Sequence, residues 1–144
     1  MTASADPALA YAVDTSVAIP ALDAGHAAHL SCLAVVRQHR PAVAGHAAYE
    51  VYAVLTRMPG QLAVAAPVAA ALIDRVFPTV AFLGEAESNA LRGRLGVLGI
   101  TGGMVYDALV AEAARVNQRV LLTRDRRAMR TYDLLGADYL VVGP

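Results

Sequence analysis

Lysine and tryptophan are missing from this sequence, and cysteine occurs once, as Cys32. All 12 basic residues are therefore arginine. Without lysine the chain cannot form a Walker-A phosphate site, a Schiff base with a substrate carbonyl, or a serine–lysine dyad. A single thiol excludes an internal disulfide and a zinc site made of cysteines, so we expect Cys32 to be a small buried hydrophobic residue.

Charge is also scarce, because only 17% of the 144 residues are charged and 12 basic residues balance 12 acidic ones. Hydrophobic residues make up 57% of the chain, which is too apolar to remain disordered. The zero net charge gives no general electrostatic attraction to nucleic acid. With no basic leader and no apolar run long enough to cross a bilayer, we expect one domain, residues 1–144, in the cytoplasm.

Short apolar runs alternate with segments of helical periodicity along the chain. We expect strands at residues 10–13, 41–44, 79–83, 119–123 and 139–142. We expect helices at residues 17–22, 26–36, 46–57, 66–76, 85–98, 103–116 and 124–135. Pro20 should interrupt the first helix, and Met58-Pro59-Gly60 should end the third. Strands that are apolar on both faces are typical of a parallel sheet covered by helices on each side, so the sequence predicts an α/β fold.

Four acidic residues stand in apolar surroundings or directly after a predicted strand, namely Asp14, Glu50, Asp107 and Asp125. Asp14 and Asp125 follow strands, while Glu50 and Asp107 lie early on helices, so all four are expected at the carboxyl end of the sheet. Carboxylates packed together repel one another, and a hard divalent cation such as Mg²⁺ or Mn²⁺ compensates that repulsion. We therefore predict a metal site that acts on a phosphodiester.

Each acid also has a purely structural interpretation. Asp14 and Asp125 are good helix caps, Asp107 is favoured by a helix dipole, and Glu50 has Arg57 seven residues later as an ion-pair partner. Taken as a set at two strand ends, however, the acids favour one shared site. Neighbouring hydroxyl groups would orient the carboxylates or serve as caps; they belong to Thr15, Ser16 and Thr123.

Four segments in chain order carry a resemblance to a known family: AYAVDTSVA, AAYEVYAVLTRMPG, YDALVAEAA and LLTRDRRAMRTYDLLG. They cover nearly the whole chain and resemble the PIN-domain ribonucleases, most of all the VapC toxins of bacterial type II toxin–antitoxin modules. This resemblance implies a three-layer α/β/α sandwich with a short central parallel sheet. It also implies a four-acid pocket that holds Mg²⁺ or Mn²⁺ and cleaves single-stranded RNA.

By the same resemblance, the catalytic and metal-binding residues are Asp14, Glu50, Asp107 and Asp125. Asp14 and Asp107 would contact the metal directly, and Glu50 and Asp125 would complete the site through waters or hydrogen bonds. The family further implies a homodimer, and a cognate VapB-like antitoxin whose tail blocks the pocket.

Half of the arginines lie between positions 115 and 130, so the positive charge is locally concentrated. If this segment adjoins the acids, it supplies phosphate contacts, and the candidate RNA-binding residues are Arg57, Arg124, Arg126 and Arg127. Ion pairs on solvated helix faces are the alternative role for these arginines. Some tyrosines could stack bases, but core or dimer packing is the stronger expectation for most. The four histidines form no convincing site and are expected at the surface or partly buried.

Two other functions compete with that of a metal-dependent nuclease. A phosphotransfer domain built on Asp14 is disfavoured, because the chain has no lysine and no second aspartate two residues later. A PIN-like module that binds RNA or a partner without cutting remains the alternative, although carboxylates at all four positions argue against a decayed site.

Overall fold

The computed structural model describes residues 9–57 and 64–143, and the predicted helix end at Met58-Pro59-Gly60 lies outside those residues. Five parallel strands form one sheet in the order β3-β2-β1-β4-β5. In chain order the strands are β1 (Ala10–Val13), β2 (Ala42–Ala44), β3 (Val80–Ala81), β4 (Arg119–Thr123) and β5 (Tyr139–Val141).

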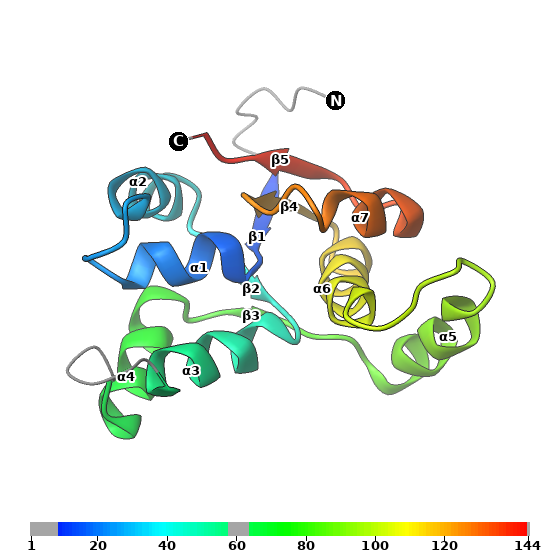
Figure 1. The fold of residues 1–144 in the computed structure, drawn as a ribbon, viewed down its shortest axis with the longest axis horizontal. Coiled ribbons are helices and arrows are strands. Elements are labelled where there is room, and N and C mark those ends of the chain that lie inside the picture. Colours follow the sequence, from blue (N-terminus) through cyan, green and yellow to red (C-terminus); the bar gives the residue numbers. More distant parts are fainter. Residues whose placement is uncertain (1–8, 58–63, 144) are drawn as a thin grey trace.

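Helices cover both faces of this sheet, as Figure 1 shows. One face carries α1 (Thr15–Leu22), α2 (His29–His39), α3 (Ala47–Arg57) and α4 (Ala66–Val76). The other carries α5 (Glu85–Leu95), α6 (Met104–Val116) and α7 (Met129–Leu135). The predicted three-layer α/β/α sandwich with a short parallel sheet is therefore confirmed. No helix of the described residues is long and apolar enough to cross a membrane.

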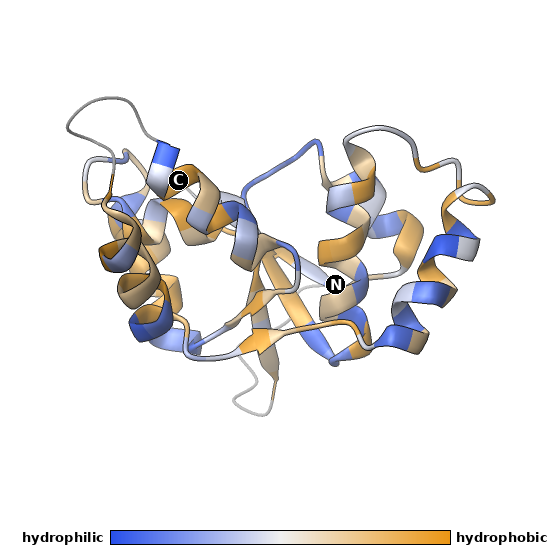
Figure 2. Cartoon of the chain, turned by 90° about the horizontal axis from the view of Figure 1, so that it is seen from below, coloured by the Kyte–Doolittle hydropathy of each residue, from blue (hydrophilic) through white to orange (hydrophobic). Residues whose placement is uncertain are grey.

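The core lies between the helical layers and is filled by the strands. Ala12 and Val13 of β1 and Leu121 of β4 are completely buried, because helices exclude water from both faces of the sheet. Figure 2 shows hydrophobic strands in the middle of the molecule and hydrophilic residues on the outer sides of the helices. The apolar runs in the sequence correspond to strands that are buried on both faces of the sheet. The amphipathic segments correspond to helices that are buried on one face only.

The chain reverses its direction across the sheet between β1 and β4, and this reversal positions the site. From β1 the chain proceeds outward to β2 and β3 on one side, then returns to β4 and β5 on the other. Connections on the two sides leave in opposite directions at the carboxyl ends of β1 and β4, which opens a crevice there. Residues that directly follow these two strands therefore face a common space.

Helix α6 packs unusually close to the carboxyl end of β2. Gly45 has a φ of +44°, and a Cβ atom at this position would lie 2.9 Å from the Cβ of Ala113 on α6. Only glycine combines this backbone conformation with the space that α6 requires. The close approach fixes α6, and with it the residues of its first turn, against the sheet.

Several predicted bounds were wrong. The helix expected at residues 26–36 is α2 at His29–His39, the one expected at 85–98 ends at Leu95, and the strand expected at 79–83 covers only Val80–Ala81. Pro20 does not interrupt α1, which runs from Thr15 to Leu22 with the proline inside it. The helix expected from residue 124 begins only at Met129. The delay has a clear cause, because Oδ1 of Asp125 accepts hydrogen bonds from the backbone N–H groups of Arg127 (2.9 Å) and Ala128 (3.3 Å). This aspartate turn competes with helical hydrogen bonding in the first residues of the segment.

Candidate active site

Asp14 is the most buried carboxylate at the crevice, with 4% of its surface exposed. It follows β1 and caps α1, because its Oδ1 accepts from the backbone N–H of Ser16 at 3.0 Å. Its oxygens also accept from three hydroxyl groups, those of Ser16 (2.5 Å), Thr123 (2.5 Å) and Tyr132 (2.7 Å). Burial raises the pKa of Asp14, and these hydrogen bonds partly oppose that rise by stabilising the charged form.

Asp107 lies in the first turn of α6, and the charges of the other acids affect its pKa. Burial, followed by the negative charges of Asp125, Glu50 and Asp14, raises the pKa of Asp107 to about 6. A carboxyl group responds to neighbouring charges in this way only when they lie close enough to escape full screening by water. The four acids singled out in the sequence therefore share one electrostatic environment.

Glu50 occupies the first turn of α3 and pairs with a histidine one helical turn earlier. Nε2 of His46 lies 3.3 Å from Oε1 of Glu50. The His46 ring in turn stacks on Tyr106, with ring centroids 5.1 Å apart and planes inclined by 19°. This contact connects α3 with α6 beside the acids. The ion pair expected between Glu50 and Arg57 is not formed, and His46 takes that place.

The segment after β4 completes the opposite side of the crevice. Thr123 is fully buried at the end of β4, and its Oγ1 both donates to Asp14 and accepts from the backbone N–H of Asp125 at 3.0 Å. The backbone N–H of Arg124 donates to Oγ of Ser16 at 2.7 Å. The two hydroxyl residues thereby join the start of α1 to the end of β4, and both donate to the Asp14 carboxylate. Thr15 begins α1 beside them.

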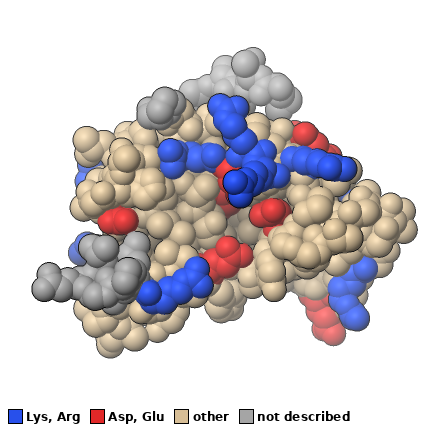
Figure 3. Space-filling view, in the orientation of Figure 1, with Lys and Arg blue, Asp and Glu red and all other residues tan. Residues whose placement is uncertain are grey.

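Arginine side chains border the acidic centre. Figure 3 shows acidic side chains in the middle of this face and a group of basic side chains above them. Arg126 and Arg127 are exposed and Arg124 is partly exposed, all in the turn after β4, while the exposed Arg57 ends α3. Two other arginines of the basic segment have structural roles instead, since Arg115 binds Glu112 and Arg119 donates to the backbone carbonyl of Tyr11.

The acids converge without forming a tight cage. Within residues 9–57 and 64–143, no three histidine, cysteine, aspartate or glutamate side chains lie close enough to hold one metal ion together. Asp14 already has both oxygens bound by hydroxyl and backbone donors. The acids therefore share one crevice, but within the described residues they form no ready-made group of three metal ligands.

Sequence reasoning missed two side chains that hold these acids. Tyr132 packs in the core with 1% exposure, and its hydroxyl group also donates to Asp14. Tyr132 lies four residues after Ala128 and three before Leu135, so all three share the buried side of α7. This helical spacing is the feature of the sequence that could have identified Tyr132 as facing inward. His46 was dismissed, although its spacing of four residues from Glu50 places both on one side of a helix.

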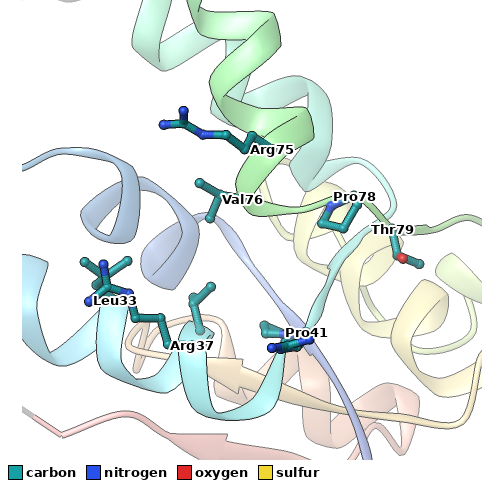
Figure 4. A pocket seen from close by; sticks show the side chains of 9 residues that line it. Leu33, Arg37, Pro41, Arg75, Val76, Pro78 and Thr79 are labelled. Carbon is teal, nitrogen blue, oxygen red and sulfur yellow. The ribbon is translucent and has the colours of Figure 1, made fainter.

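Two cavities lie near opposite ends of the strands. One of about 400 Å³ adjoins the acids and includes Ser16, Arg124 and Asp125 in its wall. A larger one of about 580 Å³ lies between α2, α4 and the segments that lead into β2 and β3, as Figure 4 shows. Its wall includes Arg37, Arg40 and Arg75 but no carboxylate, so it lacks the groups that phosphodiester chemistry with a metal needs.

Comparison with known proteins gives concordant matches over most of the chain. The PIN domain family matches residues 11–134. Ribonuclease VapC27 of Mycobacterium tuberculosis (strain ATCC 25618 / H37Rv) is 44% identical over 130 residues, which cover 90% of this chain and 95% of that protein. Ribonuclease VapC40 of Mycobacterium tuberculosis (strain CDC 1551 / Oshkosh) is 36% identical over 133 residues, which cover 91% of this chain and 98% of that protein.

Proposed function

We propose that this chain, which belongs to the PIN-domain family, is a metal-dependent endoribonuclease that hydrolyses RNA phosphodiester bonds as the toxin of a toxin–antitoxin pair. The observation that carries the proposal is the buried Asp14 carboxylate at the carboxyl end of β1, which accepts hydrogen bonds from Ser16, Thr123 and Tyr132 and has no arginine partner among the described residues. Similarity to two proteins named as VapC ribonucleases supports the same activity.

The donor set suits Mg²⁺ or Mn²⁺. All four acids offer hard oxygen ligands. Burial and then the neighbouring negative charges raise the pKa of Asp107, and a bound cation relieves the repulsion between those charges. Mg²⁺ in proteins usually keeps several waters and is held by one or two carboxylates, so this assignment does not require three protein ligands around one ion. Asp14 and Asp107 would hold the ion directly, with Glu50 and Asp125 acting through waters or hydrogen bonds.

Each part of the site then has a task. When bound, Mg²⁺ or Mn²⁺ supplies Lewis acidity toward the phosphodiester and toward the water that attacks it. Ser16, Thr123 and Tyr132 fix the orientation of the Asp14 carboxylate, so that little reorganisation is needed when substrate binds. The exposed arginines bordering the acids bind RNA phosphates and set the path of the strand; these are Arg57, Arg124, Arg126 and Arg127.

The partners follow from the same assignment. We expect a VapB-like antitoxin, because relatives with the VapC name imply that pairing. The uncompensated acids of the crevice offer a complementary surface to a basic side chain on such a partner. A homodimer and a cytoplasmic location complete the proposal, since RNA substrates are found in the cytoplasm and apolar side chains such as Val68 on α4 are exposed for a second copy to cover.

The decisive experiment measures cleavage of a mixed RNA pool by purified chain, free of antitoxin, with Mg²⁺, with Mn²⁺ and with EDTA. Asp14→Asn and Asp107→Asn should each lower the cleavage rate by more than about a hundredfold, because both remove a metal-binding charge. Asp74→Asn is the matched control, since Asp74 is exposed on α4 and should leave the rate unchanged. Cleavage that persists in EDTA would contradict the metal requirement, and binding without cleavage under every condition would favour the non-catalytic module.

A further inference from the structure

The cavity beside the acids is built from two elements far apart in the sequence. It has a volume of about 400 Å³, which lies within the range of sites for small ligands. The start of α1 and the α1–α2 connection form one wall, and the turn after β4 forms the other. Its lining comprises Thr15, Ser16, Ile19, Pro20, His26, Arg124 and Asp125.

His26 presents a hydrogen-bond donor to this cavity whichever protonation state it has. Its Nδ1 accepts a hydrogen bond from the backbone N–H of Ala28 at 3.0 Å, so the lone pair of Nδ1 is in use. The proton of the neutral ring must therefore lie on Nε2. The ring is exposed, and no hydrogen bond to its Nε2 is formed within the described part of the chain.

The connection that carries His26 is held firmly on both sides. The backbone N–H of His26 donates to the carbonyl of Asp23, and the N–H of Gly25 donates to the Asp23 side chain, both at 3.0 Å. On the far side, Nδ1 of His29 lies 2.8 Å from the carbonyl of Pro20. The imidazole is thus pre-positioned, which lowers the entropy lost when a ligand binds.

The chemistry of the lining changes across the cavity. Ile19 and Pro20 form an apolar section, while Arg124 and His26 offer donors suited to an anion. Asp125 ties the cavity to the catalytic acids, because it lines this wall and also raises the pKa of Asp107. A ligand with an apolar ring and a phosphate that extends from the acids would satisfy the whole lining.

We propose that this cavity binds the nucleotide next to the scissile phosphodiester, and that His26 Nε2–H and the Arg124 guanidinium donate to its phosphate. This assignment rests on the proposed ribonuclease function and adds a substrate-contact residue, His26, to it. The larger cavity around Arg37, Arg40 and Arg75 is less suited to this nucleotide, because it lies at the amino ends of β2 and β3, away from the acids.

The test separates binding from cleavage by using EDTA to prevent hydrolysis. Fluorescence anisotropy measures binding of a fluorescein-labelled single-stranded RNA of ten mixed-sequence nucleotides. His26→Ala should weaken binding about tenfold to a hundredfold, the effect of losing one hydrogen bond to a charged group. His26→Gln should restore affinity to within about twofold, since the glutamine amide keeps a donor close to the position of Nε2.

Matched controls distinguish this contact from a general loss of structure or charge. His39→Ala removes a histidine at the end of α2 outside the cavity, and it should bind RNA like the unaltered chain. Arg124→Gln should reduce the dependence of log Kd on log salt concentration by about one unit, whereas Arg92→Gln on α5 should not. A probe with abasic residues tests whether the contact is to phosphate, because it retains every phosphate group.

The outcomes are distinguishable. Equal weakening by His26→Ala on normal and abasic probes supports the phosphate contact. Unchanged binding of His26→Ala, or weakening confined to the normal probe, overturns it while leaving metal-dependent cleavage intact as a separate result. If the unaltered chain neither binds nor cleaves the RNA pool, the proposed function fails together with this contact.

Discussion

Two buried carboxylates, one on helix α6 and one directly after strand β1, are bound by different kinds of groups. Glu112 on α6 is 3% exposed and is bound by Arg94 at 2.9 Å and by Arg115 at 2.6 and 3.0 Å. Asp14 is 4% exposed and is bound by hydroxyl groups and a backbone N–H instead. No arginine forms an ion pair with Asp14, Asp107 or Asp125 anywhere in residues 9–57 and 64–143.

This contrast separates a structural carboxylate from those proposed to bind a metal. At Glu112 the compensating charges are permanent, and the arginines of α5 and α6 bind the two helices to each other. At the crevice the compensation is left open, so an exchangeable cation can supply it. Arginines therefore neutralise Glu112, where the contact holds two helices together, and they are not paired with the aspartates of the crevice.

The largest stability effect is expected at the compensated site. Glu112→Gln removes the charge that both arginines contact, and we expect a loss of about 2–3 kcal/mol in the free energy of unfolding. The loss stays moderate because Arg94 and Arg115 are 41% and 42% exposed and can turn toward water. Urea denaturation of the metal-free chain measures this change.

The Glu112→Gln variant also tests whether Glu112 contributes to metal binding. Because Glu112 lies outside the acid crevice, calorimetry should give Glu112→Gln an affinity for Mn²⁺ within about threefold of the unaltered chain. Glu85→Gln, at an exposed position in the first turn of α5, serves as the control and should change stability by less than about 0.5 kcal/mol. A stability loss for Glu112→Gln no larger than that of the control would show that the ion pairs contribute nothing.

A smaller effect is expected when one donor of the crevice is removed. Tyr132→Phe deletes the hydroxyl group that donates to Asp14, and we expect unfolding to become easier by about 1–2 kcal/mol. Cleavage should fall about tenfold to a hundredfold, because a side chain that orients a proposed metal ligand is lost. Tyr139→Phe is the matched control, since its hydroxyl group donates to Asp133 at the surface. Equal cleavage by both variants would remove Tyr132 from the site.

The sequence predicted the sheet and most helices because their patterns are local. The strand at 119–123 and the helix at 66–76 have the predicted bounds, since apolar runs and amphipathic periods reflect burial directly. The start of α7 was predicted five residues too early. There the side chain of Asp125 binds the backbone locally, and periodicity contains no information about such a competing contact.

The grouping of the acids was predictable, whereas some of their partners were not. Asp14 and Asp125 follow strands, so topology alone directs them to one crevice. The contact between Tyr132 and Asp14 depends on side-chain directions across elements more than a hundred residues apart, which no local pattern contains. Glu112 was missed for the same reason, because its arginine on α5 becomes a neighbour only after α5 and α6 pack.

The smallest expected change in stability is a gain instead of a loss. It comes from the acid crevice, where no arginine among the described residues pairs with Asp107. Asp107 has a folded-state pKa of about 6, above its ordinary value of 3.8, so the folded chain holds this proton more tightly than the unfolded chain does. Its contribution to stability is therefore highest below pH 3.8 and is lost as the pH rises through about 6. At neutral pH the ionised carboxylate destabilises the metal-free protein.

Asp107→Asn should accordingly stabilise the metal-free chain at pH 7.5 by about 1 kcal/mol, a figure that allows for water screening around a partly exposed carboxyl group. Thermal unfolding at pH 5 and pH 7.5 checks this, because the gain should shrink at the lower pH. Added Mn²⁺ should raise the melting temperature of the unaltered chain but not that of Asp107→Asn, since only the former keeps the ligand charge. If Asp107→Asn were destabilising without metal, Asp107 would resemble Glu112, as a carboxylate that the fold itself requires.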